Sequence, residues 1–173
     1  MCMRQKGIYH YFVEGDDDKK LLDTLKLQLG CIKSGKVDVL NVIQNNITSA
    51  KVRTLKPNTI VVLVYDTDVN NTTTLQSNIN FLKQQPNVKK VLCIPQVNNL
   101  EDELVRACNI KNIMVLTGSF GTSNFKRDFK NCTNLDSKLQ QNNFDIRRLW
   151  NQTPSNDFEM FGNNSNVVKL NIQ

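Results

Sequence analysis

Carboxylates that follow two apolar runs are the side chains of this sequence best suited to chemistry. Glu14 comes directly after the run GIYHYFV, and Asp66 ends the run TIVVLVYD and is followed by Asp68 in the order D-x-D. Both acids of a D-x-D pair can face one point where a strand begins to turn, and carboxylate oxygens are ligands that Mg²⁺ prefers. A bound cation would also offset the repulsion between such closely spaced acids. The pattern therefore predicts a divalent-metal site.

The three consecutive aspartates after Glu14 also have a simpler explanation. Asp16 and Asp17 stand at the start of a helical pattern, where carboxylates cap free N–H groups and complement the positive end of the helix dipole. The D-x-D pair can likewise serve a turn after a strand. Asp18 lies four residues after Glu14 and comes onto the same side if the helix begins near Asp16. Acids at two strand ends, taken together, favour the metal site over capping and turns.

Apolar periodicity predicts that strands and helices alternate and so position these acids. Compact β-branched and aromatic runs predict strands over residues 7–13, 37–43, 59–66 and 89–95, with a fifth strand in NIMVLTG over 112–118. Helical spacing and end signals predict helices over residues 16–30, 45–55, 75–85, 99–108, 124–131 and 134–141. This order indicates an α/β fold with an open, mostly parallel sheet of four to five strands and helices on both faces. In such sheets ligands bind at the carboxyl ends of the strands, which is where the acids fall.

A chain of 173 residues suits one domain with a substantial core. We expect an α/β core over residues 1–122 and a C-terminal extension over 123–173 that is helical and irregular and packs on the same domain. Trp150 in this extension is expected to pack onto the sheet. His10 lies inside the first strand and is expected to be a core residue rather than a catalyst.

Composition limits the compartment and the partners. The five cysteines are scattered without CxxC spacing, which argues against a disulfide framework or a zinc site and favours a reducing, cytoplasmic compartment. The apolar run near the N-terminus is short and interrupted, so we expect neither a signal peptide nor a membrane partner. The net charge of +6 suggests an anionic partner, although Lys and Arg are spread over the whole chain.

The segments FVEG and YDTD, at the ends of the first and third predicted strands, resemble the two motifs of the Toprim domain. Topoisomerases, DnaG-type primases, OLD-family nucleases and small ribosomal-RNA maturases share this domain. The spacing in EGDDD is similar to the OLD and maturase branch, where an acid one helical turn after the Glu joins the metal site; here these are Glu14 and Asp18. IPQVNNLEDEL resembles the segment of RloB-like and OLD-like proteins that adds a helix-starting Glu, which is Glu101 or, alternatively, Glu103. The resemblance covers residues 7–118.

The resemblance implies hydrolysis of phosphodiester bonds in RNA or DNA with Mg²⁺, or alternatively Mn²⁺, as cofactor. Asp66 and Asp68 would hold the principal metal, and Glu14 and Asp18 would complete its coordination. Glu14 would alternatively act as general base or acid, and Glu101 would hold a second ion.

A nuclease also needs cations for the nucleic-acid backbone. The segment NFKRDFK offers Lys126, Arg127 and Lys130 for phosphate contacts. An equally good interpretation is a helix that buries Phe125 and Phe129 and exposes its charges to solvent. The neighbouring segment TGSFGTS is rich in glycine but lacks the Lys of a P-loop, so it predicts a turn rather than a phosphate cradle.

Two alternatives to a nuclease stay open. A catalytically silent Toprim module that binds metal or a protein partner needs the same acids. For the nuclease as well, a protein partner or a homo-oligomer is an alternative. A phosphoreceiver-like domain also places acids at the ends of its first and third strands, but it requires a Lys near the end of a fifth strand, where this chain has Thr117 and Gly118. Small Toprim proteins suggest a role in phage defence or as a toxin-like effector.

Overall fold

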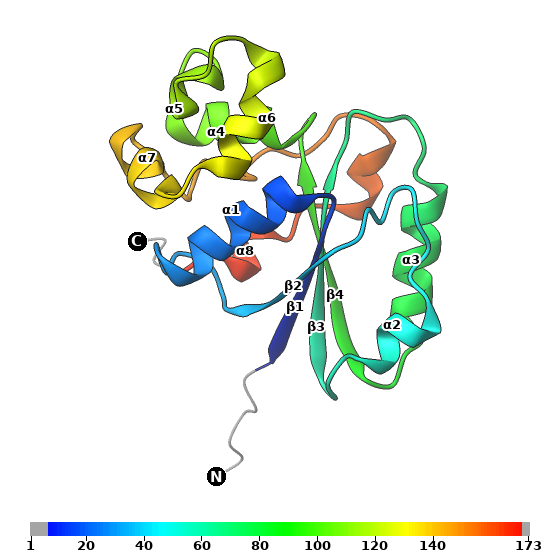
Figure 1. Ribbon diagram of the computed structural model, residues 1–173. Coiled ribbons are helices and arrows are strands. Elements are labelled where there is room, and N and C mark those ends of the chain that lie inside the picture. The colour runs from blue at the N-terminus through cyan, green and yellow to red at the C-terminus, as the bar shows by residue number, and fades with distance from the viewer. Residues whose placement is uncertain (1–6, 171–173) are drawn as a thin grey trace.

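A four-stranded parallel sheet forms the centre of the molecule in the computed structural model, which describes residues 7–170 (Figure 1). The strand order is β2-β1-β3-β4, and every neighbouring pair is parallel. The strands are β1 (Ile8–Val13), β2 (Gly35–Val39), β3 (Thr59–Asp66) and β4 (Val88–Gln96). This sheet confirms the predicted α/β class, and β3 has the predicted bounds.

Helices cover both faces of the sheet, as predicted (Figure 1). They are α1 (Asp16–Leu27), α2 (Ser49–Arg53), α3 (Thr73–Lys83), α4 (Leu100–Cys108), α5 (Met114–Thr117), α6 (Thr122–Asn131), α7 (Leu135–Gln141), the 3₁₀ helix η1 (Asp157–Phe161) and α8 (Ser165–Val168). One apolar cluster joins the sheet to α1 and α4–α8, and a second joins the opposite face to α2, α3 and η1. No helix within residues 7–170 combines the length and apolarity needed to cross a membrane.

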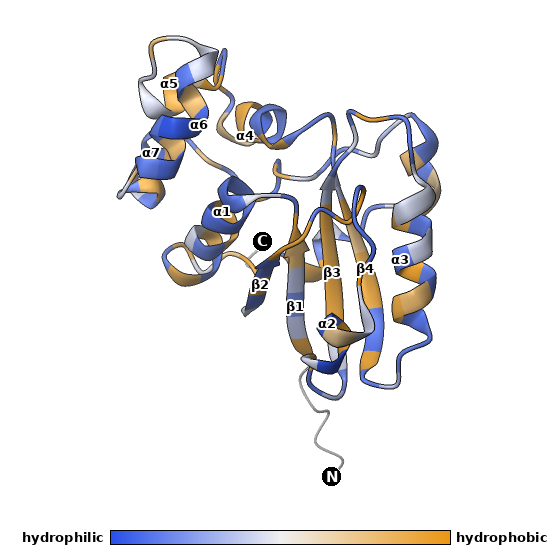
Figure 2. Cartoon of the chain, turned by 45° about the vertical axis from the view of Figure 1, so that its right-hand side comes forward, coloured by the Kyte–Doolittle hydropathy of each residue, from blue (hydrophilic) through white to orange (hydrophobic). Residues whose placement is uncertain are grey.

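The side chains of β3 explain why this strand is central. Val62 and Val64 are fully buried in the cluster that includes α1, whereas Val61 and Leu63 are fully buried in the cluster that includes α3. A strand buried on both faces reads as a continuous apolar run, and Figure 2 shows β3 as apolar along most of its length. The alternation also assigns Asp66 to the face that α1 covers.

The prediction of a fifth strand over residues 112–118 is wrong, because this segment contains the short helix α5. Ile113 and Leu116, three residues apart, are buried together, while Val115 between them is half exposed. A strand would instead bury alternate residues. Gly118 ends the helix with a left-handed φ of 70°, a conformation that glycine adopts at little cost.

The strand order creates a topological switch point between β1 and β3. The chain leaves β1 for β2 on one side and then returns to β3 on the other side. The connections on the two sides therefore diverge, and the carboxyl ends of β1 and β3 border the crevice where open α/β sheets bind ligands. Glu14 follows β1 directly, and Asp66 is the last residue of β3.

Most of the C-terminal extension packs on the α1 face of the sheet, while its 3₁₀ helix η1 packs on the opposite face. Its helices α6 and α7 both contact α1, and Trp150 is fully buried in the same apolar cluster, as predicted. His10 is also a core residue, buried on the other face with its Nε2 3.0 Å from Oδ2 of Asp38. The thiols of Cys31, Cys93, Cys108 and Cys132 are free. Cys2 and the basic residues that precede the first apolar run lie outside the described residues.

Candidate metal centre

Glu14 joins the ends of three neighbouring segments. Its Oε1 accepts a hydrogen bond from Nδ2 of Asn41 at 2.8 Å, and its Oε2 accepts one from the backbone N–H of Asp66 at 3.4 Å. Asn41 lies just beyond β2, so the carboxylate links the ends of β2, β1 and β3. Burial, and also the negative charge of Asp68, raises the pKa of Glu14.

Asp18 occupies the third position of α1 and is almost fully buried. Its Oδ2 accepts a hydrogen bond from the N–H of Gly15 at 3.0 Å, which caps the start of the helix. Its Oδ1 accepts one from Nε2 of Gln96, the last residue of β4, at 2.6 Å. Burial, and then the charges of nearby acids including Glu14, raises the pKa of Asp18 to about 7. Asp18 therefore serves both as a cap and as a member of the acidic site.

Asp66 has the most perturbed carboxylate of the site. Burial raises its pKa to about 9, together with repulsion from four acids: Glu14, Asp18, Asp68 and Glu101. Its Oδ1 is buried, and no group among residues 7–170 forms a hydrogen bond with it. A buried carboxylate oxygen without a partner costs free energy unless a cation or donor satisfies it. The charges of the other four acids predicted for the metal thus act on Asp66, although no three of these side chains form a metal-binding group within residues 7–170.

The turn that carries Asp68 is held by its neighbour Thr67. The Thr67 N–H donates to the carbonyl oxygens of Gln96 and Asn98 at 3.1 and 3.0 Å, and its hydroxyl donates to the carbonyl of Gln96 at 3.1 Å. From the C-terminal extension, Nδ2 of Asn156 donates to the carbonyl oxygen of Thr67 at 3.0 Å. The extension therefore helps to fix the D-x-D turn, while the Asp68 side chain stays exposed.

Glu101 and Glu103 both lie in the first turn of α4, which Asn99 caps through the N–H of Asp102 at 3.0 Å. Glu101 is partly exposed, and its Oε1 lies 3.8 Å from Nζ of Lys126. Glu103 is fully buried and accepts hydrogen bonds from the N–H groups of Val97 and Trp150 and from Nη2 of Arg106. Both carboxylate oxygens of Glu103 already accept hydrogen bonds from the protein, so Glu101 is the acid of α4 that can bind a metal at the site.

Asp16 and Asp17 differ from the acids of the site. Asp16 is exposed and lies 3.9 Å from Nζ of Lys130. Asp17 is half buried, and burial raises its pKa while the charge of Lys126 lowers it. Neither side chain caps α1, because that role belongs to Asp18. Solvation, rather than capping, accounts for Asp16.

The basic side chains of α6 lie beside the acids at the start of α1. Asp16, Asp17, Lys126, Arg127 and Lys130 line one groove. The cations are largely exposed, whereas Phe125 and Phe129 on the opposite side of the helix are buried. The structure confirms the second interpretation of this segment, because the aromatic side of the helix is buried and the charged side faces solvent, while the phosphate contacts stay a prediction.

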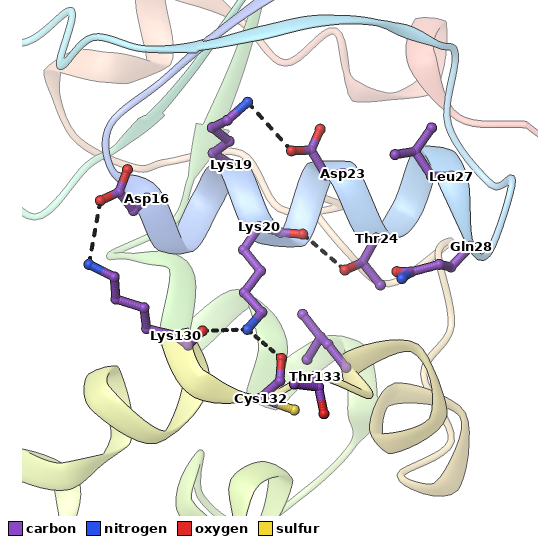
Figure 3. Close-up of a pocket in the computed structure, with 11 residues that line it drawn as sticks. Asp16, Lys19, Lys20, Asp23, Thr24, Leu27, Gln28, Lys130, Cys132 and Thr133 are labelled. Carbon is purple, nitrogen blue, oxygen red and sulfur yellow. Dashed lines mark hydrogen bonds and ion pairs between the residues drawn. The ribbon is translucent and has the colours of Figure 1, made fainter.

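Lys20 holds the C-terminal end of α6 against α1. Its Nζ donates to the carbonyl oxygens of Phe129 and Lys130 at 2.7 and 2.6 Å and also to that of Cys132 (Figure 3). A cation suits this position because the last carbonyls of a helix lack partners within it. The pocket drawn in Figure 3 surrounds this contact, and none of the five acids lines it. Lys20 therefore has a structural role and positions the charges of α6.

The donors of the acidic site suit a hard divalent cation. All five are carboxylates, and oxygen ligands are preferred by Mg²⁺ and also suit Mn²⁺. The orphaned Oδ1 of Asp66 fits the same interpretation. Within residues 7–170, no three acidic, histidine or cysteine side chains already form a group with metal-binding geometry. The acids are thus close neighbours that repel one another, rather than a preformed cage around one point.

Sequence analysis missed three amides that organise the site. Gln96 holds Asp18, Asn41 holds Glu14, and Asn156 holds the turn after Asp66. Gln96 ends β4 at the same edge as the acids, so the rule that ligands bind at strand ends could have identified it. Asn41 follows β2 in the same way. Asn156 carried no signal, because it stands in an irregular segment far from the site in sequence.

The raised pKa values predict that metal-free protein loses stability as the pH rises. The ordinary pKa of Asp is 3.8, and the folded values are about 7 for Asp18 and about 9 for Asp66. The folded state therefore holds protons that the unfolded state releases. The contribution of these two protonated carboxyls to the free energy of unfolding is fully present below pH 3.8 and is lost between pH 3.8 and 9. We expect the free energy of unfolding in EDTA to fall by roughly 5 kcal/mol from pH 5 to pH 7, because each of the two carboxyls keeps close to one extra proton in the folded state over most of this range.

Urea unfolding in EDTA between pH 5 and pH 8 measures this dependence. The double variant Asp18→Asn/Asp66→Asn should have a flatter profile, because amides do not titrate. Stability that rises with pH in the wild type, or an unchanged slope in the double variant, would contradict the assignment.

Comparison of this chain with protein-family models, with curated proteins and with solved structures finds no match.

Proposed function

We propose that this protein is a Mg²⁺-dependent, Toprim-type nuclease that hydrolyses phosphodiester bonds of RNA or DNA. The observation that carries the proposal is Asp66, whose buried and unpartnered oxygen lies among four other acids at the switch point of the sheet. Structural ion pairs do not explain these acids, since none of Glu14, Asp18 and Asp66 has a cation within 4.0 Å among residues 7–170. A cation from solution is the natural partner.

Each acid has a role that follows from its surroundings. Asp66 and Asp68 would hold the principal ion, because they share the turn that Thr67 fixes. Glu14 and Asp18 would complete the coordination, and Glu101 would hold a second ion. A divalent ion in this position lowers the pKa of water and stabilises the charge that develops on phosphate oxygens. Mn²⁺ offers the same chemistry with the same ligands.

Glu14 is also suited to proton transfer. Its pKa is raised, chiefly by burial, and a carboxylate with a raised pKa is a better general base or acid near neutral pH. The hydrogen bond from Asn41 fixes the orientation of one oxygen at the crevice. Glu14 would take the proton from the attacking water or return one to the leaving oxygen.

Lys126, Arg127 and Lys130 would contact the phosphate backbone of the substrate. They line a groove that begins at the acids of α1, and Lys126 lies 3.8 Å from Glu101. A nucleic acid bound along α6 would therefore reach the acidic site.

The order of the motifs supports a Toprim assignment. FVEG ends β1, YDTD ends β3, and the acid of α4 follows β4, in the positions that the resemblance requires. A role as a phage-defence or toxin-like effector in the cytoplasm is part of this proposal.

A catalytically silent metal- or partner-binding Toprim module is the second candidate. Two observations favour it: the acids do not already form a metal-binding group within residues 7–170, and both oxygens of Asp18 accept hydrogen bonds. Such a module would bind metal or a protein partner without cleaving nucleic acid.

An assay with mixed substrates tests the proposal. Purified protein is incubated with tRNA, single-stranded and duplex RNA and DNA in Mg²⁺, Mn²⁺ or EDTA. We expect cleavage that needs metal and falls at least about 100-fold in Glu14→Gln, since one general base or acid contributes about that much. Glu159→Gln is the matched control, because Glu159 is exposed in η1 and lines neither the acidic site nor the groove of α6. Absence of cleavage with every substrate, in a folded protein that binds metal, would favour the silent module.

A further inference from the structure

Phe120 is the most exposed large apolar residue described, with 94% of its surface accessible. Aromatic side chains normally bury most of their area, so an aromatic ring left almost wholly in solvent needs an explanation. The other aromatic residues of this part of the chain behave differently, since Phe125 and Phe129 are buried. Phe120 contributes nothing to the core.

The loop that carries Phe120 is held on both sides. Gly118 donates its N–H to the carbonyl oxygen of Met114 at 2.8 Å, and the carbonyl oxygen of Phe120 accepts from Nδ2 of Asn124 at 2.8 Å. Gly118 and Gly121 adopt positive φ values of 70° and 97°, which suit glycine, on the two sides of Phe120. The backbone thus presents the ring outward from a defined turn.

The position of this loop relates it to the proposed substrate path. Phe120 lies two residues before α6, and Lys126 lies in the second turn of that helix. With a rise of about 1.5 Å per residue, the start of α6 is only about 6 Å along the axis from Lys126. Lys126 in turn lies 3.8 Å from Glu101 of the acidic site. The exposed aromatic ring therefore belongs to the same short stretch of chain as Lys126, which reaches the acidic site.

We propose that Phe120 is a stacking platform for an unpaired base, and that the substrate is therefore a single-stranded segment of nucleic acid. The inference rests on the proposed nuclease function and adds the class of substrate. Aromatic rings beside a basic groove bind single strands, because each base offers a flat face while the cations follow the backbone. Bases in a duplex are already stacked and are not accessible to such a ring. RNA and DNA share this chemistry.

Fluorescence anisotropy in EDTA, which prevents metal-dependent cleavage, tests the inference. Labelled single-stranded RNA, single-stranded DNA and a duplex of the same length are titrated with wild type, Phe120→Ala and Phe120→Trp. We expect Phe120→Ala to weaken single-strand binding about tenfold and to leave duplex binding unchanged, and Phe120→Trp to restore the affinity. Met160→Ala is the matched control, because Met160 is also largely exposed but lies in η1.

The salt dependence separates stacking from charge. Phe120→Ala should lower affinity at every salt concentration without changing the slope of log K against log salt, whereas Lys126→Gln should reduce that slope by about 0.7 for a single strand. Single-strand binding that is unchanged in Phe120→Ala overturns the inference, and cleavage by the wild type would then leave the proposed function intact. A wild type that neither binds nor cleaves any nucleic acid overturns both.

Discussion

Asp66→Asn is expected to reduce metal-dependent cleavage by at least about 100-fold and, at the same time, to stabilise the metal-free protein. Cleavage falls because the amide carries no negative charge to bind the cation. The metal-free protein gains stability because burial and the charges of four other acids disfavour the Asp66 carboxylate, and an amide carries no charge. Side chains that lower the stability of the folded protein are typical of functional sites.

Cleavage rates and melting temperatures of the same preparation measure both effects. Glu159→Gln is again the matched control, since this exposed glutamate of η1 should change neither quantity appreciably. Cleavage by Asp66→Asn within threefold of the wild type would remove Asp66 from the metal site. A fall in melting temperature would show that the carboxylate stabilises the fold instead.

Glu103→Ala is expected to lower the free energy of unfolding by about 3–5 kcal/mol. The side chain is fully buried and accepts hydrogen bonds from the N–H groups of Val97 and Trp150 at 2.9 and 2.8 Å and from Nη2 of Arg106 at 2.7 Å. Alanine leaves two buried N–H groups and a half-buried guanidinium without this partner. It also releases the extension at Trp150 from α4.

Chemical denaturation of Glu103→Ala beside Glu101→Ala gives a matched comparison. Both substitutions remove a glutamate from the first turn of the same helix, but Glu101 is partly exposed and has only a 3.8 Å ion pair with Lys126. We expect Glu101→Ala to change stability by less than about 1 kcal/mol. Equal losses in the two variants would contradict the structural role of Glu103.

The sequence predicted β1, β3 and β4 well because these strands contain long apolar runs, whereas the more polar β2 begins two residues and ends four residues before the predicted range of 37–43. The run over residues 59–66 coincides with β3, and Glu14 follows β1 as expected. The segment over 112–118 failed because a short apolar run fits a buried helix as well as a strand. Only the tertiary contacts of Ile113 and Leu116 decide between the two.

The acids of the site were predictable, but their partners were not. Glu14, Asp18 and Asp66 were identified because carboxylates at strand ends follow a general rule of α/β sheets. The contacts between Gln96 and Asp18 and between Asn156 and Thr67 join residues 78 and 89 positions apart, which no local pattern encodes. The local sequence likewise does not show which of Glu101 and Glu103 can bind a metal. That difference depends on burial, since Glu103 is fully buried and Glu101 is partly exposed.

Direct metal binding is the measurement that tests the central claim, which is that the five acids hold a divalent cation. Mn²⁺ binding is followed by electron paramagnetic resonance at pH 8, with and without a phosphorothioate oligonucleotide, for wild type, Asp66→Asn and Asp16→Asn. We predict saturable binding by the wild type and by Asp16→Asn, competition by Mg²⁺, and affinity at least about tenfold weaker in Asp66→Asn. Equal binding by wild type and Asp66→Asn, or none by the folded wild type in either condition, would contradict it.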